Sequence, residues 1–100
     1  MIVTITRGAT ADLEAIGDYI SQDNSERAVS FVDEIVDRCR RLGGAPNAYA
    51  VVPRLAHLGI RKRTFRNYLI FYRVLADRVE IVHVLNAARD YEAILLADND

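Results

Sequence analysis

The sequence Gly59-Ile-Arg-Lys-Arg-Thr-Phe-Arg-Asn-Tyr-Leu-Ile-Phe-Tyr-Arg73 joins the densest basic cluster of the chain to its most strongly β-forming run. Residues 68–72 are aromatic or bulky aliphatic, the kinds of side chain that fit a pleated sheet. The five bases of the stretch are Arg61, Lys62, Arg63, Arg66 and Arg73, with no acid among them. Like charges crowded on a sheet do not help it to fold, so this cluster is the first candidate for a functional surface.

Three strands are expected in this half of the chain. The first covers residues 59–65, Asn67 marks a bend, and the second covers residues 68–75. A turn at 76–78 leads into a third strand at 79–85, which pairs with the second as an antiparallel hairpin. Alternation gives the second strand two faces, with Tyr68, Ile70, Tyr72 and Val74 on one and Leu69, Phe71, Arg73 and Leu75 on the other.

The first half of the chain predicts one strand and a helical hairpin. Residues 2–5 are β-branched and alternate, which indicates a strand. Thr10 is the expected N-cap of a first helix, with two acids in its first turn. Ser25 is expected to cap a second helix that ends at Gly43-Gly44. A short polar turn at 22–25 makes the two helices an antiparallel pair.

The remaining elements complete an α+β fold with the order βααβββα. Residues 45–58 predict a surface loop with at most one irregular turn. Residues 90–97 predict a short helix with Tyr91, Ile94 and Leu95 facing inward. The helical hairpin then packs on one face of a small, mostly antiparallel sheet, with the first strand at an edge and the terminal helix on the other face. The sequence leaves the strand order open.

Length and composition predict one soluble domain over residues 1–100. No apolar run approaches the ~20 residues needed to cross a bilayer, and residues 1–7 lack the features of a signal peptide. A single cysteine, Cys39, cannot form an internal disulfide, which is typical of a reducing compartment. We therefore expect a cytoplasmic protein with no membrane partner.

The net charge of −1 conceals three blocks of opposite sign. Residues 1–37 hold two arginines and eight acids, a balance of −6. Residues 38–76 hold nine bases and no acid, whereas residues 77–100 hold two arginines and six acids. This asymmetry predicts an acidic or phosphate-bearing partner for the middle block. The alternative, of equal weight, is that the blocks neutralise one another within the fold.

Several motifs occur in a fixed order in the second half: Gly59-Ile-Arg61, Asn67-Tyr-Leu-Ile-Phe-Tyr-Arg-Val74, Val79-Glu-Ile-Val-His-Val-Leu85 and Ala88-Arg-Asp-Tyr91. In this order they resemble the ParE branch of the RelE/ParE toxin superfamily. The helical hairpin resembles that family too, so the likeness covers nearly the whole chain.

The resemblance implies the toxin of a bacterial type II toxin–antitoxin pair, of the kind linked to plasmid stabilisation and growth inhibition. A ParD-like antitoxin would hold it inactive in a hetero-oligomeric complex and would supply any contact with DNA. ParE-like members are associated with inhibition of DNA gyrase, whereas RelE-like relatives cut mRNA on the ribosome.

The residues themselves give weak support to RNA cleavage, which needs a base, an acid and cations around the phosphate. His83 lies in an apolar strand, alternating with Ile81 and Leu85, which favours a packed or hydrogen-bonded role. His57 is a lone loop histidine, and a solvated role is favoured. Tyr91 is surrounded by acids, which repel RNA. We therefore favour a binding protein without a catalytic site, and keep the ribosome-dependent mRNA interferase as the alternative.

No cofactor or metal is expected. The two histidines and Cys39 lack ligand spacing, and Cys39 falls on an apolar helix stripe, as a structural thiol does.

The candidate residues for binding the target or the antitoxin are Arg61, Arg63, Arg66, Arg73, Arg89 and Tyr91. The last two are included because the resemblance implies that the C-terminal region matters for toxicity. Extra apolar residues on the second helix indicate either an antitoxin-binding face or close packing of the two helices. The alternative is internal neutralisation, in which Arg61 and Arg73 pair with acids of the helices. Arg61 and Arg63 are expected to be exposed, so that Arg61→Glu and Arg63→Glu leave folding nearly intact, within ~0.5 kcal/mol. A third possibility is a non-toxic binding module with the same fold.

Overall fold

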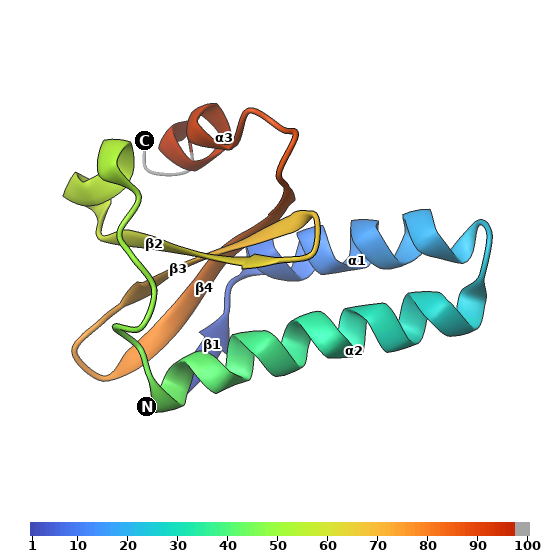
Figure 1. The fold of residues 1–100 in the computed structure, drawn as a ribbon, viewed down its shortest axis with the longest axis horizontal. Coiled ribbons are helices and arrows are strands. Elements are labelled where there is room, and N and C mark those ends of the chain that lie inside the picture. Colours follow the sequence, from blue (N-terminus) through green and yellow to red (C-terminus); the bar gives the residue numbers. More distant parts are fainter. Residues whose placement is uncertain (98–100) are drawn as a thin grey trace.

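The computed structural model describes residues 1–97 and has the expected element order, with two 3₁₀ helices added (Figure 1). The elements are β1 (Ile2–Ile5), α1 (Arg7–Ser21), α2 (Ser25–Arg41), 3₁₀ helices at Leu42–Gly44 and Pro53–Leu58, β2 (Ile60–Phe65), β3 (Tyr68–Val74), β4 (Arg78–Asn86) and α3 (Tyr91–Ala97). The segment expected to be a loop therefore contains a 3₁₀ helix, which begins at Pro53, where the fixed φ of proline suits a first helical position.

The strands form one sheet in the order β1-β4-β3-β2. The pairs β2–β3 and β3–β4 are antiparallel, and β1 lies at the edge, parallel to β4, with Ile2 opposite Arg78 and Ile5 opposite Ile81. The expected α+β class and the edge position of β1 are thus confirmed. Among residues 1–97, no helix is long and apolar enough to span a bilayer.

The sheet has an apolar core on each face, as the alternation of β3 predicted. The helical hairpin covers one face, where Ile70 and Tyr72 pack with Phe31 and Ile35 of α2. On the other face, Leu69 and Phe71 of β3 pack in a separate core with Leu95 of α3. Tyr91 and Ile94 are partly buried against that core, so the inward face expected of the terminal helix is confirmed.

The expected alternation of His83 with Ile81 and Leu85 is wrong. The register between β3 and β4 shifts between Phe71 and Tyr72, and β4 carries one extra residue there. Such a bulge re-aims the side chains beside it. Ile81 consequently packs in the core under the hairpin, whereas Leu85 packs in the core under α3.

Both helix starts differ from the sequence prediction. Thr6 caps α1, because its Oγ1 accepts a hydrogen bond from the amide of Ala9 at 3.1 Å, so Thr10 lies inside the helix and no acid lies in the first turn. Asn24 caps α2 one residue before Ser25, and its Oδ1 accepts from the amide of Arg27 at 2.9 Å. In each case another residue of the capping type lay close by, and only the backbone path decides which side chain reaches the free amide.

Candidate partner-binding surfaces

Arg61 and Arg63 point from the edge strand β2 toward the C-terminal end of α2. Arg61 donates from Nη1 to the carbonyl oxygen of Tyr49 at 2.7 Å. Arg63 donates to the carbonyl oxygen of Arg38 at 3.2 Å, and its guanidinium lies 5.1 Å from the Tyr49 ring centroid. A cation at the last turn of a helix meets the negative end of the helix dipole. The two arginines therefore fasten α2 and the segment after it to the sheet.

The expectation that Arg61 and Arg63 are exposed is wrong, since both side chains are half-buried. Beneath them, the hydroxyl of Tyr72 donates to the carbonyl oxygen of Pro46 at 2.9 Å, and burial raises the pKa of this phenol. Burial also raises the pKa of the Cys39 thiol to about 12, although Arg63 and Arg40 nearby act to lower it. Cys39 is fully buried, as a structural thiol is expected to be.

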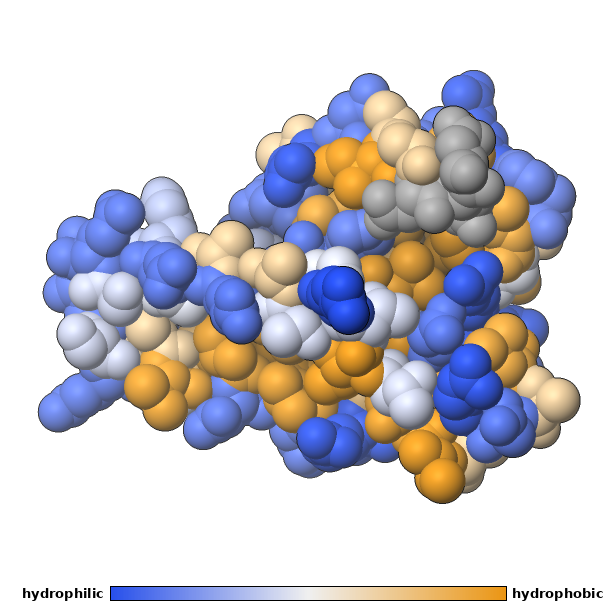
Figure 2. All heavy atoms as spheres, turned by 180° about the vertical axis from the view of Figure 1, so that it is seen from behind, coloured by the Kyte–Doolittle hydropathy of each residue, from blue (hydrophilic) through white to orange (hydrophobic). Residues whose placement is uncertain are grey.

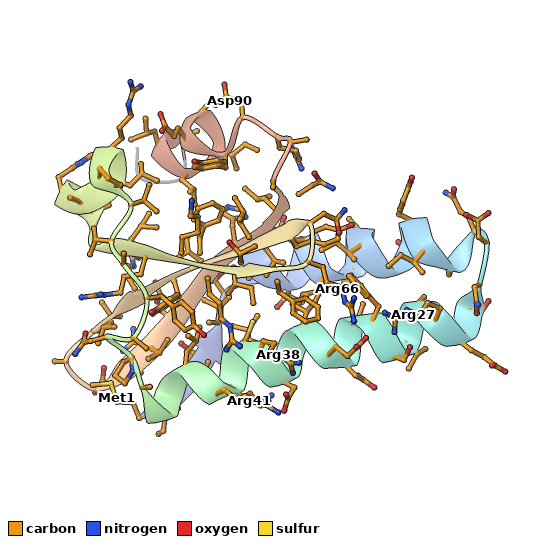
Figure 3. All side chains as sticks on the ribbon, in the orientation of Figure 1. Met1, Arg27, Arg38, Arg41, Arg66 and Asp90 are labelled. Atoms are coloured by element: carbon orange, nitrogen blue, oxygen red, sulfur yellow. The ribbon has the colours of Figure 1, made fainter. Side chains whose placement is uncertain are left out.

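Arg66 and Arg73 lie away from this pair and on different parts of the sheet. Arg66 occupies the turn between β2 and β3 with a φ of 54°, and its Nη2 lies 3.7 Å from Oε1 of Glu34 (Figure 3). Arg73 lies on the α3 face and donates from Nε and Nη2 to Oε1 of Glu80, at 3.0 and 2.8 Å. The expected partner of Arg73 is thus corrected: it pairs with an acid of β4, next to it in register, and not with a helix.

Tyr91 and Arg89 belong to the C-terminal end of the described chain. The ring of Tyr91 packs on Phe71 with centroids 5.0 Å apart, and the ammonium of Lys62 lies 5.9 Å from the Tyr91 centroid. Arg89 is exposed beside a hollow lined also by Tyr19, Asn67 and Asn86, and it has no ion-pair partner among residues 1–97. Asp98 and Asp100, two of the acids that surround Tyr91 in the sequence, lie outside the described residues.

His83 braces α1 against β4. Its Nδ1 lies 2.6 Å from Oδ2 of Asp12, and the same oxygen accepts a hydrogen bond from the amide of Val84 at 2.9 Å. The imidazole is buried, so the hydrogen-bonded role favoured by the sequence is confirmed. His57 is exposed in the second 3₁₀ helix.

A groove between α1 and α2, on the side of the hairpin away from the sheet, is the surface that the sequence revealed only in part. It has a volume of about 560 Å³. Its lining is Thr10, Leu13, Glu14, Gly17, Asp18 and Ser21 from α1, with Ser25, Ala28, Val29, Val32 and Asp33 from α2. An apolar strip runs along the hairpin between hydrophilic margins (Figure 2). The extra apolar side of α2 was noticed in the sequence, but the acids that recur beside it at helical spacing were not.

The basic block at residues 38–76 and the acidic block at residues 1–37 differ in how many of their charges are paired within the fold. The middle block is largely engaged: apart from Arg40, each of its bases has an acid, a carbonyl oxygen or an aromatic ring as partner within residues 1–97. In the first block, five of the eight acids have no ion pair within the same residues, namely Glu14, Asp18, Asp23, Glu26 and Asp33. The blocks therefore neutralise each other only in part.

The same arrangement occurs in proteins of known kind. A family model described as the ParE toxin of the type II toxin–antitoxin system parDE matches residues 3–91. This chain belongs to the ParE toxin family. A chain from a solved structure of the chromosomal ParDE TA system from P. aeruginosa is 29% identical and superposes with a TM-score of 0.72. The match covers 86% of this ParE-family chain and 95% of that one. No curated protein matches the sequence.

Proposed function

We propose that this ParE-family protein is a cytoplasmic toxin that stops growth by binding and inhibiting DNA gyrase, with no catalytic site of its own. A ParD-like antitoxin holds it inactive in a hetero-oligomeric complex and makes any contact with DNA. The family match supports the toxin role, and the likeness to a chain of a ParDE system supports an antitoxin partner.

One observation carries the choice of binding over RNA cleavage: two of the three groups considered for acid–base chemistry, His83 and Tyr91, are engaged inside the fold, and the third, His57, is exposed in a 3₁₀ helix. A general acid or base must come within hydrogen-bond reach of its substrate. The imidazole of His83 is instead buried on Asp12, and the ring of Tyr91 is packed between Phe71 and Lys62. Arg73, a candidate phosphate ligand, is bound to Glu80 through two nitrogen atoms.

The predicted binding residues fall into two groups, according to whether their side chains are exposed or engaged in contacts within the fold. Arg66 and Arg89 are exposed. Arg89 has no ion pair within residues 1–97, and the contact of Arg66 with Glu34 is long, at 3.7 Å, so both side chains can form charge-assisted bonds with an acidic partner. Arg61, Arg63, Arg73 and Tyr91 shape the surface through the internal contacts described above. We therefore assign direct target or antitoxin contact to Arg66 and Arg89, and a positioning role to the other four.

A gyrase supercoiling assay with purified protein tests the proposed target. We expect inhibition by the natural chain, loss of inhibition in Arg89→Glu, and no loss in Arg40→Glu, a control at an equally exposed and unpaired arginine. Normal supercoiling at excess protein would reject gyrase as the target. Cleaved message in a translation reaction would support the mRNA interferase, and induction without growth arrest would support a non-toxic binding module.

The antitoxin partner is tested by co-expression with the small ribbon–helix–helix protein expected from the adjacent reading frame. We expect the two proteins to elute together and supercoiling to recover. Separate elution at micromolar concentrations would reject that partner, whatever the toxin's target is.

A further inference from the structure

The hollow beside Arg89 lies where α1 meets the start of β3 and the end of β4, and we call it the Arg89 hollow. Its volume is about 420 Å³. Ile16, Val84 and Leu85 form an apolar floor, each with less than a tenth of its surface exposed. Tyr19 stands at the rim with 69% of its surface exposed. An apolar floor with a few polar groups around it is the usual composition of a binding site.

The walls of the Arg89 hollow are fixed to one another by hydrogen bonds. Oδ2 of Asp12 on α1 accepts from the amide of Val84 at 2.9 Å and lies 2.6 Å from Nδ1 of His83, so α1 is held against β4. The amide of Ala87 donates to the carbonyl oxygen of Asn67 at 2.9 Å, which holds the segment after β4 against the turn before β3. A hollow with braced walls binds without a large cost of ordering them.

The charges of the lining favour an acidic occupant. Arg89 is the one cation among the described residues that line the hollow, and it has no ion pair within residues 1–97. The one acid of the same lining, Asp12, is already engaged with β4. A guanidinium matches a carboxylate through two parallel hydrogen bonds. Exposed arginine and tyrosine beside buried apolar residues are also the side chains that dominate the energy of protein interfaces.

The same lining is less suited to a nucleotide. Phosphate sites combine several backbone amides, often at a helix N-terminus, with cations. Here a single arginine faces a lining that also contains a carboxylate. The hollow is also shorter than a helix-binding groove and takes a few side chains, as a loop of a folded protein presents them.

We propose that the Arg89 hollow anchors a loop of the toxin's target protein that carries an aspartate or glutamate beside a leucine-sized side chain. The carboxylate binds Arg89, the apolar side chain lies on Val84 and Leu85, and the ring of Tyr19 covers it. That this partner is the target rests on the proposed function, whereas the chemistry of the loop rests on the hollow. Tyr19 thus joins Arg89 as a target-binding residue.

The first test uses two acetylated peptides of about six residues, both with two leucines, one with two aspartates and the other with two lysines. In amide NMR spectra of the isotope-labelled natural chain, we expect the aspartate peptide to shift the signals of residues 19, 67 and 86–89. The lysine peptide should bind at least tenfold more weakly. Shifts confined to other residues, or equal binding of the two peptides, would overturn the proposal. So would tighter binding of adenosine monophosphate at the same residues, since the hollow would then be a nucleotide site.

Charge reversal gives a matched pair of variants. In Arg89→Glu, we expect the aspartate peptide to bind at least tenfold more weakly and the lysine peptide to bind better. Arg40→Glu makes the same change at an exposed arginine outside the hollow, and the preference should stay as in the natural chain. Tyr19→Ala should weaken the aspartate peptide severalfold. Circular dichroism checks that the variants are folded, and equal effects of the two arginine variants would contradict the assignment.

The second test joins the hollow to the target. We expect Tyr19→Ala to need at least fivefold more protein than the natural chain for half-inhibition of gyrase supercoiling, while it still elutes with the antitoxin. Normal inhibition by Tyr19→Ala, or loss of the antitoxin with normal inhibition, would remove the target from the hollow. The peptide experiment contains no gyrase. Failure of the natural chain to inhibit gyrase therefore rejects only the proposed target, and the peptides then decide the chemistry of the hollow alone.

Discussion

The groove of the helical hairpin and the basic edge of the sheet carry opposite charges, and they use them differently. At the sheet edge, Arg61 and Arg63 donate hydrogen bonds to carbonyl oxygens of their own chain. In the groove, Asp18 and Asp33 have no ion pair within residues 1–97. The density of charge in a sequence therefore does not locate a binding surface. Charges without an internal partner are the better candidates for binding, and within residues 1–97 more of them lie in the acidic block at 1–37 than in the basic block.

The largest expected effect comes from comparing a core residue and a groove residue of the same helix, α2, by their contributions to stability. Ile35 of α2 is fully buried, so Ile35→Ala should lower the free energy of unfolding by about 2–5 kcal/mol. Val29 is mostly exposed, so Val29→Ala should change it by less than about 0.5 kcal/mol. Urea unfolding of the two variants measures the difference. A large stability loss at Val29 would show that the groove wall is structural.

Arg63 offers the corresponding test at the sheet edge. Arg63→Glu removes a charged donor from the carbonyl of Arg38 and places a carboxylate at the negative end of α2. We expect a loss of about 1.5–3 kcal/mol in urea unfolding, the usual range for hydrogen bonds to charged groups. Arg40→Glu, in the last turn of the same helix, also places a carboxylate at the negative helix end and serves as the control for that effect, with an expected loss of about 0.3–1 kcal/mol. Equal stability of the two variants would show that the contact of Arg63 with the Arg38 carbonyl does not stabilise the fold, and that Arg63 behaves as an exposed surface charge.

Cys39, beneath the same arginines, gives a prediction in pH. Burial raises the pKa of this thiol from its ordinary value of 9.0 to about 12, so folding favours the protonated form. That stability is fully present below pH 9 and is lost as the pH rises toward 12, by about 1 kcal/mol between pH 9 and pH 10. In urea unfolding, the loss between pH 9 and pH 10 should be about 1 kcal/mol larger for the natural chain than for Cys39→Ala, in which only the buried Tyr72 still contributes. Rapid alkylation of the native thiol at pH 8 would contradict this burial.

The smallest effect is expected at Gly17. A Cβ there would lie 3.5 Å from Cγ2 of Val32, an ordinary contact, so alanine fits without strain. Replacing a helical glycine by alanine raises stability by up to ~1 kcal/mol. Gly17→Ala should therefore unfold at a higher urea concentration than the natural chain. A lower midpoint would show that the added methyl does not fit beside Val32.

Periodicity in the sequence was sufficient to predict the helices, the strands and the two faces of β3, because side chains alternate between the two faces along a strand. It failed at His83, where one extra residue in β4 breaks the alternation and no local signal marks the bulge. It also failed at the helix caps, where Thr6 and Asn24 replaced Thr10 and Ser25.

The candidate site was harder to predict than the fold. The basic residues were found at once, but whether a charge is paired depends on neighbours that are distant in sequence. Arg63 meets a carbonyl 25 residues away, and Asp12 meets His83 71 residues away. The groove requires the antiparallel placement of two stripes, which becomes visible only after the hairpin is built.

The parallel pairing of β1 with β4 has a consequence for how the protein is made. Ile2 can pair only after Arg78 has been synthesised, and Ile5 only after Ile81. The sheet therefore remains incomplete until most of the chain has been synthesised. Contacts between residues so far apart are slow to form, because a long loop must close before they contribute. A nascent chain that stops before β4 leaves β1 unpaired and exposes the apolar face of the hairpin, which favours degradation or aggregation over activity. The toxin surface is thus assembled only near the end of translation, when the first strand of the sequence can pair with the last.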